Sequence, residues 1–220
     1  MIYMNTKENK VSSAVVKRLP KYYRYLGQIN DKEIIRVSSG ELSEITGLTA
    51  SQIRQDLNHF GGFGQQGYGY NVNDLKAEIE KIIGINNSYK AIVIGLGNIG
   101  KAIFHYKGFQ MSGMEVIGLF DRNPEIIGTT VQELKVRNVN ELESFLTKEK
   151  ADIGILAIPA DKAQEVCDIL VNSGIGGIWN FAPIDLKLPK NVVLENVHLD
   201  ESLFTLTYYL NNLKDYPGNK

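Results

Sequence analysis

The chain has 220 residues, of which 43% are hydrophobic and 22% charged, so it can bury either one large core or two small ones. Its formal net charge of −1 gives no overall sign of nucleic-acid binding, and any basic surface for DNA must therefore be local. No segment is long and apolar enough to span a bilayer, and the N-terminus lacks a signal-peptide pattern. We therefore expect a cytoplasmic protein without a membrane partner.

The N-terminal region contains a local concentration of positive charge. Apolar residues at helical spacing from Val11 to Ile29 predict a helix that bends or restarts at Pro20. Between Lys10 and Asn30 there are five basic residues and no acidic ones. They are Lys10, Lys17, Arg18, Lys21 and Arg24. A solvated helix face is the ordinary explanation of such a run, and binding to DNA is the alternative.

The next segment predicts two short helices joined by a tight turn. Ser38 stands three residues before Glu41, which is the spacing of a capping box, and a short helix through Ile45 follows. Gly47 ends that helix, and Thr49 to Gln52 repeats the capping pattern before a helix that runs to about Phe60. This arrangement predicts a helix-turn-helix.

The segment from Gly61 to Val72 predicts a β-hairpin wing, because glycines permit tight turns and aromatic residues favour paired strands. Asn73-Asp74 can cap a further helix from Leu75 to Ile83, which Gly84 ends. The run 86–88 then indicates a linker between domains.

From Tyr89 onward, short apolar strands alternate with helices, a pattern that predicts a parallel sheet covered on both faces. The predicted strands are Ala91 to Ile94, Val116 to Phe120, Val136 to Val139, Ile153 to Ile158, Gly177 to Asn180 and Val192 to Leu194. The last helix carries leucines at spacings of four and three residues, which predicts a helix that packs on another helix. They are Leu199, Leu203, Leu206, Leu210 and Leu213.

Metal and thiol chemistry receive little support. The single cysteine, Cys167, lies in an apolar helical pattern and is expected to pack in the core. The three histidines are far apart in sequence, so we predict no metal site.

A glycine-rich turn follows the first strand of the predicted sheet directly. In Gly95-Leu96-Gly97-Asn98-Ile99-Gly100 the first glycine allows a tight turn, the second lets the backbone approach a pyrophosphate, and the third lets a helix sit close to the strand. The N-terminus of that helix offers free amides to phosphates. The pattern and its position between strand and helix predict a dinucleotide site.

Asp121 ends the second strand, 21 residues after Gly100, where a carboxylate can accept the adenosine ribose hydroxyls and repel a 2′-phosphate. NAD(H) is therefore favoured, while the neighbouring Arg122 keeps NADP(H) as an alternative. A Rossmann-type domain that binds coenzyme A, another nucleotide or no nucleotide also stays open.

The sequence leaves little room for a substrate pocket. A dehydrogenase needs an acid or base beside the nicotinamide, but only about 25 residues follow the last strand. His105, Asp161 and His198 are the acid–base candidates, and such isolated residues are more often structural. A nucleotide-binding domain joined to a winged helix instead predicts a ligand-controlled switch and not an enzyme.

These motifs, in this order, resemble the redox-sensing transcriptional repressor Rex over nearly the whole chain. The resembling stretches are Lys17 to Leu26, Thr49 to Leu57, Gly67 to Tyr70, Gly95 to Gly100, Tyr106 to Phe109 and Asn180 to Pro183. The resemblance implies a homodimer with exchanged C-terminal helices, whose wings bind a palindromic operator when NADH is scarce and which NADH releases.

The resemblance and the motifs together define the expected architecture and sites. The expected fold is α/β, with a winged helix-turn-helix DNA-binding domain over residues 1–85, a Rossmann NAD(H)-binding domain over 86–198, and a domain-swapped dimerisation helix and tail over 199–220. The expected cofactor residues are Gly95, Gly97, Asn98, Ile99, Gly100, Tyr106, Phe109, Asp121, Arg122 and Pro159. The expected DNA-binding residues are Thr49, Ser51, Gln52, Arg54, Gln55, Gln65, Gln66, Gly67 and Tyr68.

Within these sites, the resemblance implies specific roles. Arg54 would reach base edges or nearby phosphates in the major groove, supported by Ser51 and Gln52. A salt bridge from Arg54 to Asp56 or Glu44 is the alternative without DNA. Tyr106 would pack beside the nicotinamide, whose ring is positive in NAD⁺ and neutral and puckered in NADH.

Two positions depart from the family pattern. The resemblance implies a switch network of Arg24, Tyr106 and an aspartate, but His198 stands at the aspartate position, so the link from Arg24 is expected to be absent or rerouted. Gln65-Gln66 replaces a basic pair of the wing, which predicts a shallower salt dependence of DNA binding. A winged-helix regulator that responds to coenzyme A or another adenine nucleotide is the second interpretation, and a dehydrogenase with an interaction domain is the third.

Overall fold

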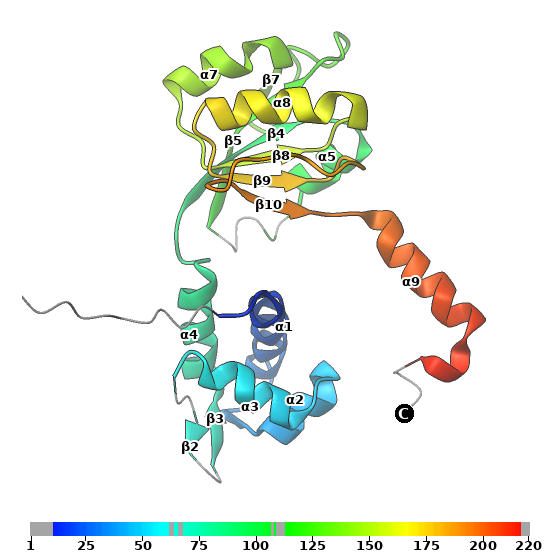
Figure 1. Cartoon of the computed structure of the whole chain (residues 1–220). Helices are drawn as coiled ribbons and strands as arrows, with labels where there is room; N and C mark the ends of the chain where they lie inside the picture. Colours follow the sequence, from blue (N-terminus) through cyan, green and yellow to red (C-terminus); the bar gives the residue numbers. More distant parts are fainter. Residues whose placement is uncertain (1–10, 62–63, 66–67, 107, 109–112, 217–220) are drawn as a thin grey trace, which may run out of the picture. The chain divides into compact units, whose positions relative to one another are not determined.

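The computed structural model describes residues 11–61, 64–65, 68–106, 108 and 113–216. The chain divides into two compact units, the first ending at Asn87 and the second beginning at Ser88, so the division falls within the predicted linker (Figure 1). Each unit has a hydrophobic core of its own.

The first unit is built mainly from four helices: α1 (Ser13–Asn30), α2 (Ser39–Thr46), α3 (Ala50–Asn58) and α4 (Val72–Ile83). Pro20 lies inside α1, which spans both halves of the predicted bent helix. The Ser38–Glu41 capping box forms at the start of α2, and Gly47 ends α2 in the left-handed conformation, at φ 69°. Both features confirm the predicted helix-turn-helix signals, because they fix where α2 stops and α3 can begin.

The start of α4 differs from the prediction. Asn71, not Asn73-Asp74, is the N-cap, and its side chain accepts hydrogen bonds from the backbone amides of Asn73 and Asp74. The helix therefore begins at Val72, whose fully buried side chain joins the core. Gly84 ends it at φ 80°, as predicted.

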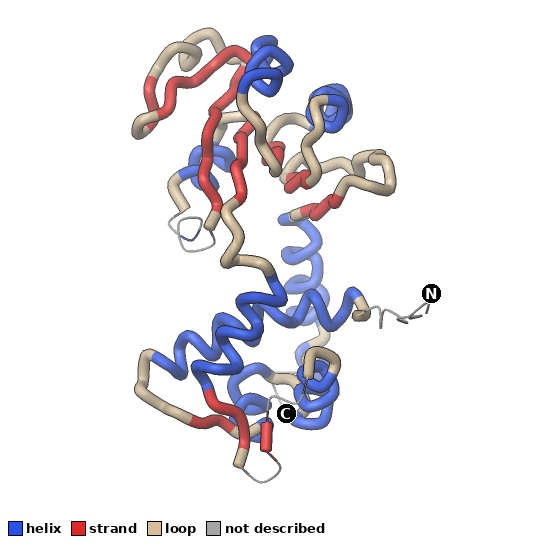
Figure 2. Tube along the Cα trace, turned by 90° about the vertical axis from the view of Figure 1, so that its left-hand side faces the viewer, coloured by secondary structure: helices blue, strands red, loops and turns tan. Residues whose placement is uncertain are grey.

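A small sheet completes the first unit. Strands β1 (Arg36–Val37), β2 (Gly64–Gln65) and β3 (Gly69–Asn71) form an antiparallel sheet in the order β1-β3-β2, and Figure 2 shows these short strands in red beside the blue helices. The hairpin of β2 and β3 was predicted as the wing, whereas β1 was not predicted. A Cβ at Gly69 would collide with the carbonyl oxygen of Val37, so β1 and β3 can approach this closely only because a glycine stands there.

The core of the first unit combines residues from all four helices. Leu19, Tyr22 and Leu26 of α1 pack with Leu42 of α2 and with further apolar residues. Those further residues include Ile53 and Leu57 of α3 and Leu75 and Ile79 of α4. The spacing of the buried residues on each helix is the amphipathic period read from the sequence.

The second unit is organised around a seven-stranded sheet. Its strands are β4 (Tyr89–Ile94), β5 (Met114–Asp121), β6 (Thr130–Val131), β7 (Leu134–Asn138), β8 (Ile153–Leu156), β9 (Gly177–Asn180) and β10 (Val193–Asn196). The order is β10-β9-β8-β4-β5-β7-β6, and all pairs are parallel except β6–β7. The six predicted strands are present with ends shifted by a few residues, while the edge hairpin formed by β6 was not predicted.

Helices cover both faces of this sheet. Successive β4 residues point to opposite sides: Ile92 and Ile94 join a cluster with α7 (Leu142–Lys148) and α8 (Ala160–Asn172). Ala91 and Val93 join a second cluster that includes residues of α5 (Asn98–Phe104). Figure 1 shows α7 and α8 together on one face of the sheet. Cys167 lies fully buried in the first cluster, which confirms its predicted packing role.

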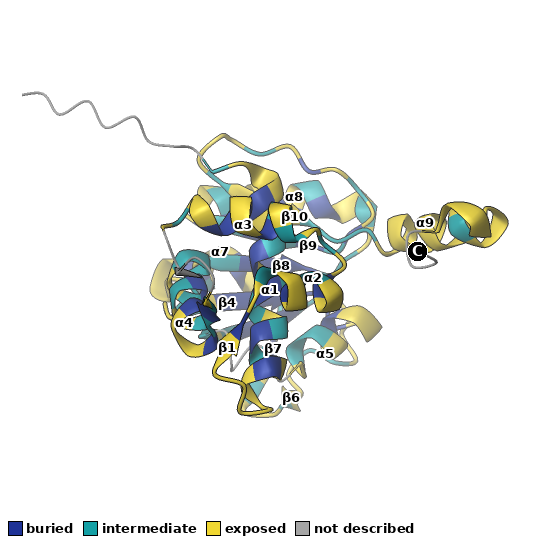
Figure 3. Ribbon diagram, turned by 90° about the horizontal axis from the view of Figure 1, so that it is seen from below, coloured by how far each residue is buried: buried dark blue, intermediate teal, exposed yellow. Residues whose placement is uncertain are grey.

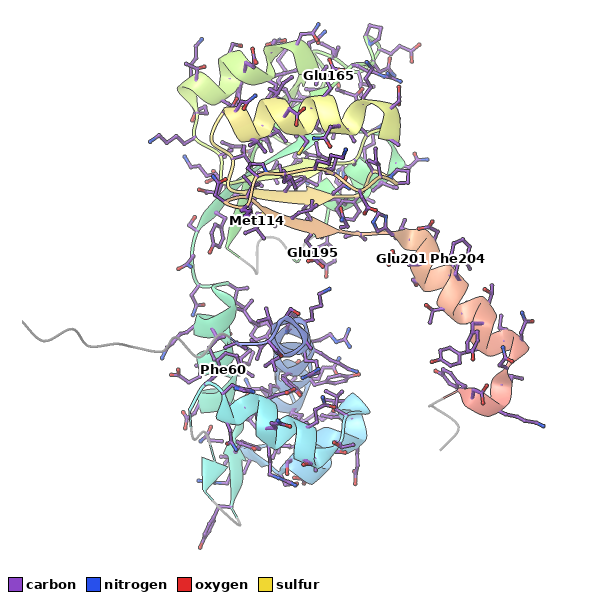
Figure 4. The ribbon with its side chains drawn as sticks, in the orientation of Figure 1. Phe60, Met114, Glu165, Glu195, Glu201 and Phe204 are labelled. Carbon is purple, nitrogen blue, oxygen red and sulfur yellow. The ribbon has the colours of Figure 1, made fainter. Side chains whose placement is uncertain are left out.

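The C-terminal helix is almost wholly exposed. Helix α9 (Leu199–Asn211) and the 3₁₀ turn η2 (Leu213–Asp215) contain no buried residue, and in Figure 3 α9 is yellow along nearly its whole length. Leu199, Leu203, Leu206 and Leu210 are between 55 and 63% exposed, and Figure 4 shows the side chain of Phe204 on the same helix. Among the described residues, no helix is both long and apolar enough to cross a membrane.

Candidate functional site

The glycine turn after β4 has the geometry that its three glycines predict. Gly95 adopts φ 92°, and a Cβ there would collide with the carbonyl oxygen of Ala157, at the end of β8. A Cβ at Gly100 would collide with the carbonyl oxygen of Gly95 and lie 3.4 Å from the Cβ of Ala157. Glycines at these two positions therefore let α5 start immediately against the strand ends.

Gly97 is different from its two neighbours in the motif. It is the N-cap of α5 in an extended conformation, and an added Cβ would meet nothing within 4 Å. No side chain caps this helix start. The fold itself therefore does not require glycine at this position, whereas a ligand that approaches the backbone closely would.

Asp121, the last residue of β5, is held by the same turn. Its Oδ2 accepts a hydrogen bond from the amide of Leu96 at 2.6 Å, and its Oδ1 accepts one from the amide of Asn123 at 2.8 Å. Each carboxylate oxygen has a second lone pair, which can accept a hydroxyl hydrogen. The backbone thus orients this carboxylate toward the turn before any ligand arrives.

A cavity of about 600 Å³ opens beside the turn and Asp121. Five of the expected cofactor residues line it: Gly95, Gly97, Asp121, Arg122 and Pro159. Its walls also include apolar side chains of β4, α7 and α8, which suit a flat ring. Such volume and mixed lining are typical of a small-molecule site at the carboxyl ends of parallel strands.

Sequence reasoning did not identify the wall of this cavity beyond the turn. Its additional polar side chains are Asn140 of η1 (Val139–Glu141), Glu143 of α7, and Lys162 and Glu165 of α8; Figure 4 labels Glu165. A usable signal existed, because residues that follow β7 and β8 must lie at the same sheet edge as Gly95. Lys162 donates to Glu165 at 3.1 Å, so these two charges are paired in the structure.

The remaining expected cofactor residues lie outside the lining of the cavity. Asn98, Ile99 and Gly100 form the first turn of α5, and Ile99 is exposed. Tyr106 follows α5 and is 65% exposed. Phe109 lies outside the described residues.

The two other expected switch residues have partners in their own units. His198 is the N-cap residue of α9, and its Nε2 lies 3.7 Å from Oδ1 of Asp185. The guanidinium of Arg24 lies 5.0 Å from the ring centre of Tyr25, the next residue in α1. Among the described residues, no group of three or more potential ligands could hold a metal ion.

In the first unit, the expected DNA-binding residues gather on the exposed face of α3. Ser51, Arg54 and Gln55 line a shallow hollow together with Asn58 and His59, two residues that the sequence analysis did not select. Asn58 and His59 continue the helical spacing from Ser51 and Gln55, which was the available signal. The opposite face, with Ile53, Asp56 and Leu57, is buried.

Two contacts fix the start of this face. Thr49 caps α3 by accepting a hydrogen bond from the amide of Gln52 at 3.2 Å. The Nη1 of Arg54 donates to the Oγ of Ser39, on α2, at 2.8 Å. Arg54 therefore contacts α2, and the predicted alternative pairing with Asp56 is wrong because Asp56 lies on the buried face and binds Arg18.

The wing residues are only partly described. Gln65 lies in β2, opposite Gly69, and Tyr68 is 70% exposed at the turn. Arg36 of β1 donates to the carbonyl oxygen of Tyr68 at 3.2 Å, which holds the turn. Gln66 and Gly67 lie outside the described residues.

A helix-turn-helix with a wing and a Rossmann-type nucleotide cavity in one chain define a nucleotide-regulated DNA-binding protein. Residues 86–184 match the family described as CoA binding domain, and residues 10–58 match the putative DNA-binding protein N-terminus family. The chain belongs to the Rex family of redox-sensing transcriptional repressors. It is 54% identical over 205 residues to the Rex of Clostridium novyi (strain NT), covering 93% of this chain and 98% of that protein. The Rex of Clostridioides difficile (strain 630) is 55% identical over 200 residues, covering 91% and 95%.

Solved structures of RSP, a Rex-family repressor, are also similar. RSP in complex with β-NAD⁺ and operator DNA is 53% identical, with a TM-score of 0.87 over 93% of this chain and 94% of that one. RSP in complex with β-NADH is 49% identical, with a TM-score of 0.87 over 97% and 100%. These similarities confirm the predicted family and fold class.

Proposed function

We propose that this protein is a homodimeric transcriptional repressor that binds palindromic operator DNA and is released by NADH, so that it responds to the ratio of NADH to NAD⁺. The observation that carries the proposal is the oriented Asp121 carboxylate at the glycine-lined cavity, in a chain that also presents Arg54 on an exposed α3. The relative RSP, seen with NAD⁺ and operator DNA and with NADH, supports the same pairing of ligands.

NAD(H) suits the cavity better than coenzyme A or NADP(H). The Asp121 carboxylate can accept the 2′- and 3′-hydroxyls of an adenosine ribose, and its negative charge repels a phosphate at either position. NADP(H) carries a 2′-phosphate, and coenzyme A a 3′-phosphate. Asp121 outweighs the neighbouring Arg122 in this selection, because two backbone amides fix its carboxylate oxygens in place.

Binding to DNA would use two exposed parts of the first unit, helix α3 and the wing. Thr49, Ser51, Gln52, Arg54 and Gln55 would enter the major groove, where a helix of this kind offers both donors and acceptors to base edges. The wing from Gln65 through Gln66 and Gly67 to Tyr68 would follow the adjacent backbone. Because the wing carries glutamines and no basic pair, its phosphate contacts are few.

The exposed apolar side of α9 is the proposed dimer contact. A row of leucines more than half exposed to water is stable when a second helix covers it, and exchange between two copies of this chain would do so. Operator palindromes match a two-fold dimer. A repressor that acts on operator DNA would work in the cytoplasm, and the similar repressors support a role in binding rather than catalysis.

The switch would depend on the nicotinamide. NAD⁺ brings a positive ring and NADH a neutral, puckered one, and Tyr106 is the proposed contact for that ring. Arg24 and His198 would transmit this difference to the DNA-binding units of the dimer. The two ligands can shift the dimer only if they bind its two arrangements with different affinity.

Fluorescence anisotropy with the operator DNA used in the RSP complex tests the proposal. The protein alone and the protein with NAD⁺ should bind the labelled duplex, and NADH should release it while coenzyme A should not. Release by coenzyme A and not by NADH would favour the second candidate ligand. Turnover of NAD⁺ with simple hydroxy acids would contradict the non-enzymatic assignment.

A further inference from the structure

A buried ionic cluster joins α1 to the back of α3. Arg18 Nε donates to Asp56 Oδ2 at 2.6 Å, and Arg18 Nη2 donates to Asp56 Oδ1 at 2.8 Å. The hydroxyl of Tyr22, one turn along α1 from Arg18, donates to the same Oδ2 at 2.7 Å. Asp56 is 2% exposed and its oxygens have three donors, so this carboxylate belongs to the interior of the unit.

The cluster sits behind the residues that face DNA in the proposed function. Asp56 lies on the buried side of α3, between Ile53 and Leu57, whereas Arg54 and Gln55 lie on the exposed side. Because Asp56 and Arg54 lie on opposite sides of α3, a small rotation of the helix about its axis would move both side chains at once, each in the direction opposite to the other.

Apolar packing sets which face of α3 turns inward but defines its exact rotation less strictly than a directional polar contact does. Ile53 and Leu57 share their core with residues of α1, α2 and α4, but apolar contact is not directional. A two-pronged pair between a guanidinium and a carboxylate has a fixed plane and two fixed directions, and the phenol adds a third. The cluster is thus a directional contact between α1 and α3.

The positive charge of Arg18 is also paired with a carboxylate inside the first unit. Arg18 stands in the basic run of α1 beside Lys17, whose side chain is exposed. Its Nε and Nη2 both donate to Asp56, and its side chain is only 22% exposed. The basic run of α1 was interpreted as a solvated face, with DNA binding as the alternative, and at Arg18 its positive charge is instead paired with Asp56.

We propose that Arg18, Asp56 and Tyr22 are positioning residues that set the rotation of α3, and thereby the preference for operator over other DNA, without contacting DNA. The proposal rests on the proposed function for the identity of the DNA. It divides the basic run of α1 into an internal member, Arg18, and solvent-facing members such as Lys17.

The test compares Arg18→Lys, Tyr22→Phe and the control Lys17→Gln in the full chain. Arg18→Lys keeps the charge but loses the two-pronged contact, and Tyr22→Phe removes one hydroxyl while the ring stays in the core. Affinities for the RSP operator and for a scrambled duplex are measured at several salt concentrations, below the unfolding temperature of each variant. A merely structural role would change that temperature but not the ratio of the two affinities.

Both cluster variants should lower the ratio of operator to scrambled affinity about tenfold, with the salt slope unchanged, and Lys17→Gln should keep the ratio. A phosphate contact by Arg18 would instead be preserved by lysine, so an unchanged ratio in Arg18→Lys would overturn the proposal. A further variant, Arg18→Met, removes the charge altogether. A salt slope lowered by about one in this variant, with an unchanged ratio, would also overturn the proposal, because one lost phosphate contact has that effect.

Amide hydrogen exchange separates failure of this proposal from failure of the proposed function. If the wild-type protein binds neither duplex, the proposed function fails, and exchange still decides whether the cluster holds α3. Exchange across Ala50–Asn58 should be at least about tenfold faster in Tyr22→Phe and Arg18→Lys than in wild type, with α4 unchanged. Equal exchange of α3 in all variants would refute the positioning role.

Discussion

Changing Gly97 to alanine should weaken NADH binding while leaving the fold intact. Gly97 has φ −67° and ψ −166°, an extended conformation that alanine adopts freely, and its added Cβ would meet no atom within 4 Å. Replacing glycine where the conformation suits alanine stabilises a protein by about 0.4–1 kcal/mol, because the unfolded chain loses freedom. The free energy of unfolding should therefore stay level or rise slightly.

The expected loss of affinity for NADH follows from the open space beside Gly97. The Cβ would project where the pyrophosphate must approach the amides at the start of α5, so at least one charge-assisted hydrogen bond would lengthen or break. Such bonds contribute about 1.5–3 kcal/mol. NADH should therefore bind about 10- to 150-fold more weakly.

Calorimetric titration with NADH and thermal unfolding give the two readouts. Gly176→Ala is the matched control, because its Cβ also meets nothing within 4 Å and it lies before β9, at the other end of the strands. Gly95→Ala provides the opposite comparison: its φ of 92° and the carbonyl of Ala157 should make that variant unstable.

Two results would refute this reasoning. If Gly97→Ala binds NADH as tightly as Gly176→Ala does, the pyrophosphate does not cross this turn. If Gly97→Ala unfolds well below wild type, the space beside Gly97 is not open in the folded protein.

Three further changes test other parts of the molecule. Asp121→Asn should weaken NADH binding at least tenfold in the same titration. Both carboxylate oxygens of Asp121 accept a backbone N–H, so in either orientation the NH₂ group of asparagine would face one of these donors. Unchanged affinity would exclude a contact with the ribose. Asp56→Asn should lower the free energy of unfolding by about 3 kcal/mol at neutral pH, because Arg18 loses its buried partner. Burial acts to raise the pKa of Asp56, but hydrogen bonds from Arg18 and Tyr22 outweigh it and hold that pKa below 3.8. The stability it contributes is complete above pH 3.8 and is lost as the pH falls through the lower folded-state pKa, so denaturant titrations should show the gap to Asp56→Asn closing only below pH 3.8. His198→Asp should change the NADH concentration needed for release from DNA at least about fivefold, because it offers Arg24 a carboxylate across the dimer. If this variant, Arg24→Ala and His198→Ala all behave as wild type, Arg24 and His198 are not part of the switch.

The sequence predicted most of the elements because their signals are local. The capping box at Ser38, the left-handed glycines Gly47 and Gly84, and the alternating apolar residues of β4 each act over a few neighbours. Gly95 and Gly100 were also read correctly, since the collisions that they avoid involve the turn itself and the adjacent strand end.

What was missed depends on contacts between distant residues. β1 and β6 have two residues each, too few for any periodicity, and exist only through pairing with β3 and β7. The cavity wall on η1 and α7 reaches Gly95 only after the sheet forms. The role of Arg18 was hidden for the same reason, because its partner Asp56 is 38 residues away and a run of basic residues gives no sign that one of them faces inward.

The position of Cys167 separates this protein from sensors that react with oxidants directly. It is the only cysteine of the chain, and burial, with a smaller effect of Asp168, raises the pKa of its thiol to about 11. Peroxides and disulfides attack the thiolate, which at neutral pH would form about one part in ten thousand of such a group, and the interior of the sheet blocks their approach. Oxidative stress should therefore leave this sulfur untouched, and the repressor would respond to NADH and not to oxidation of its cysteine.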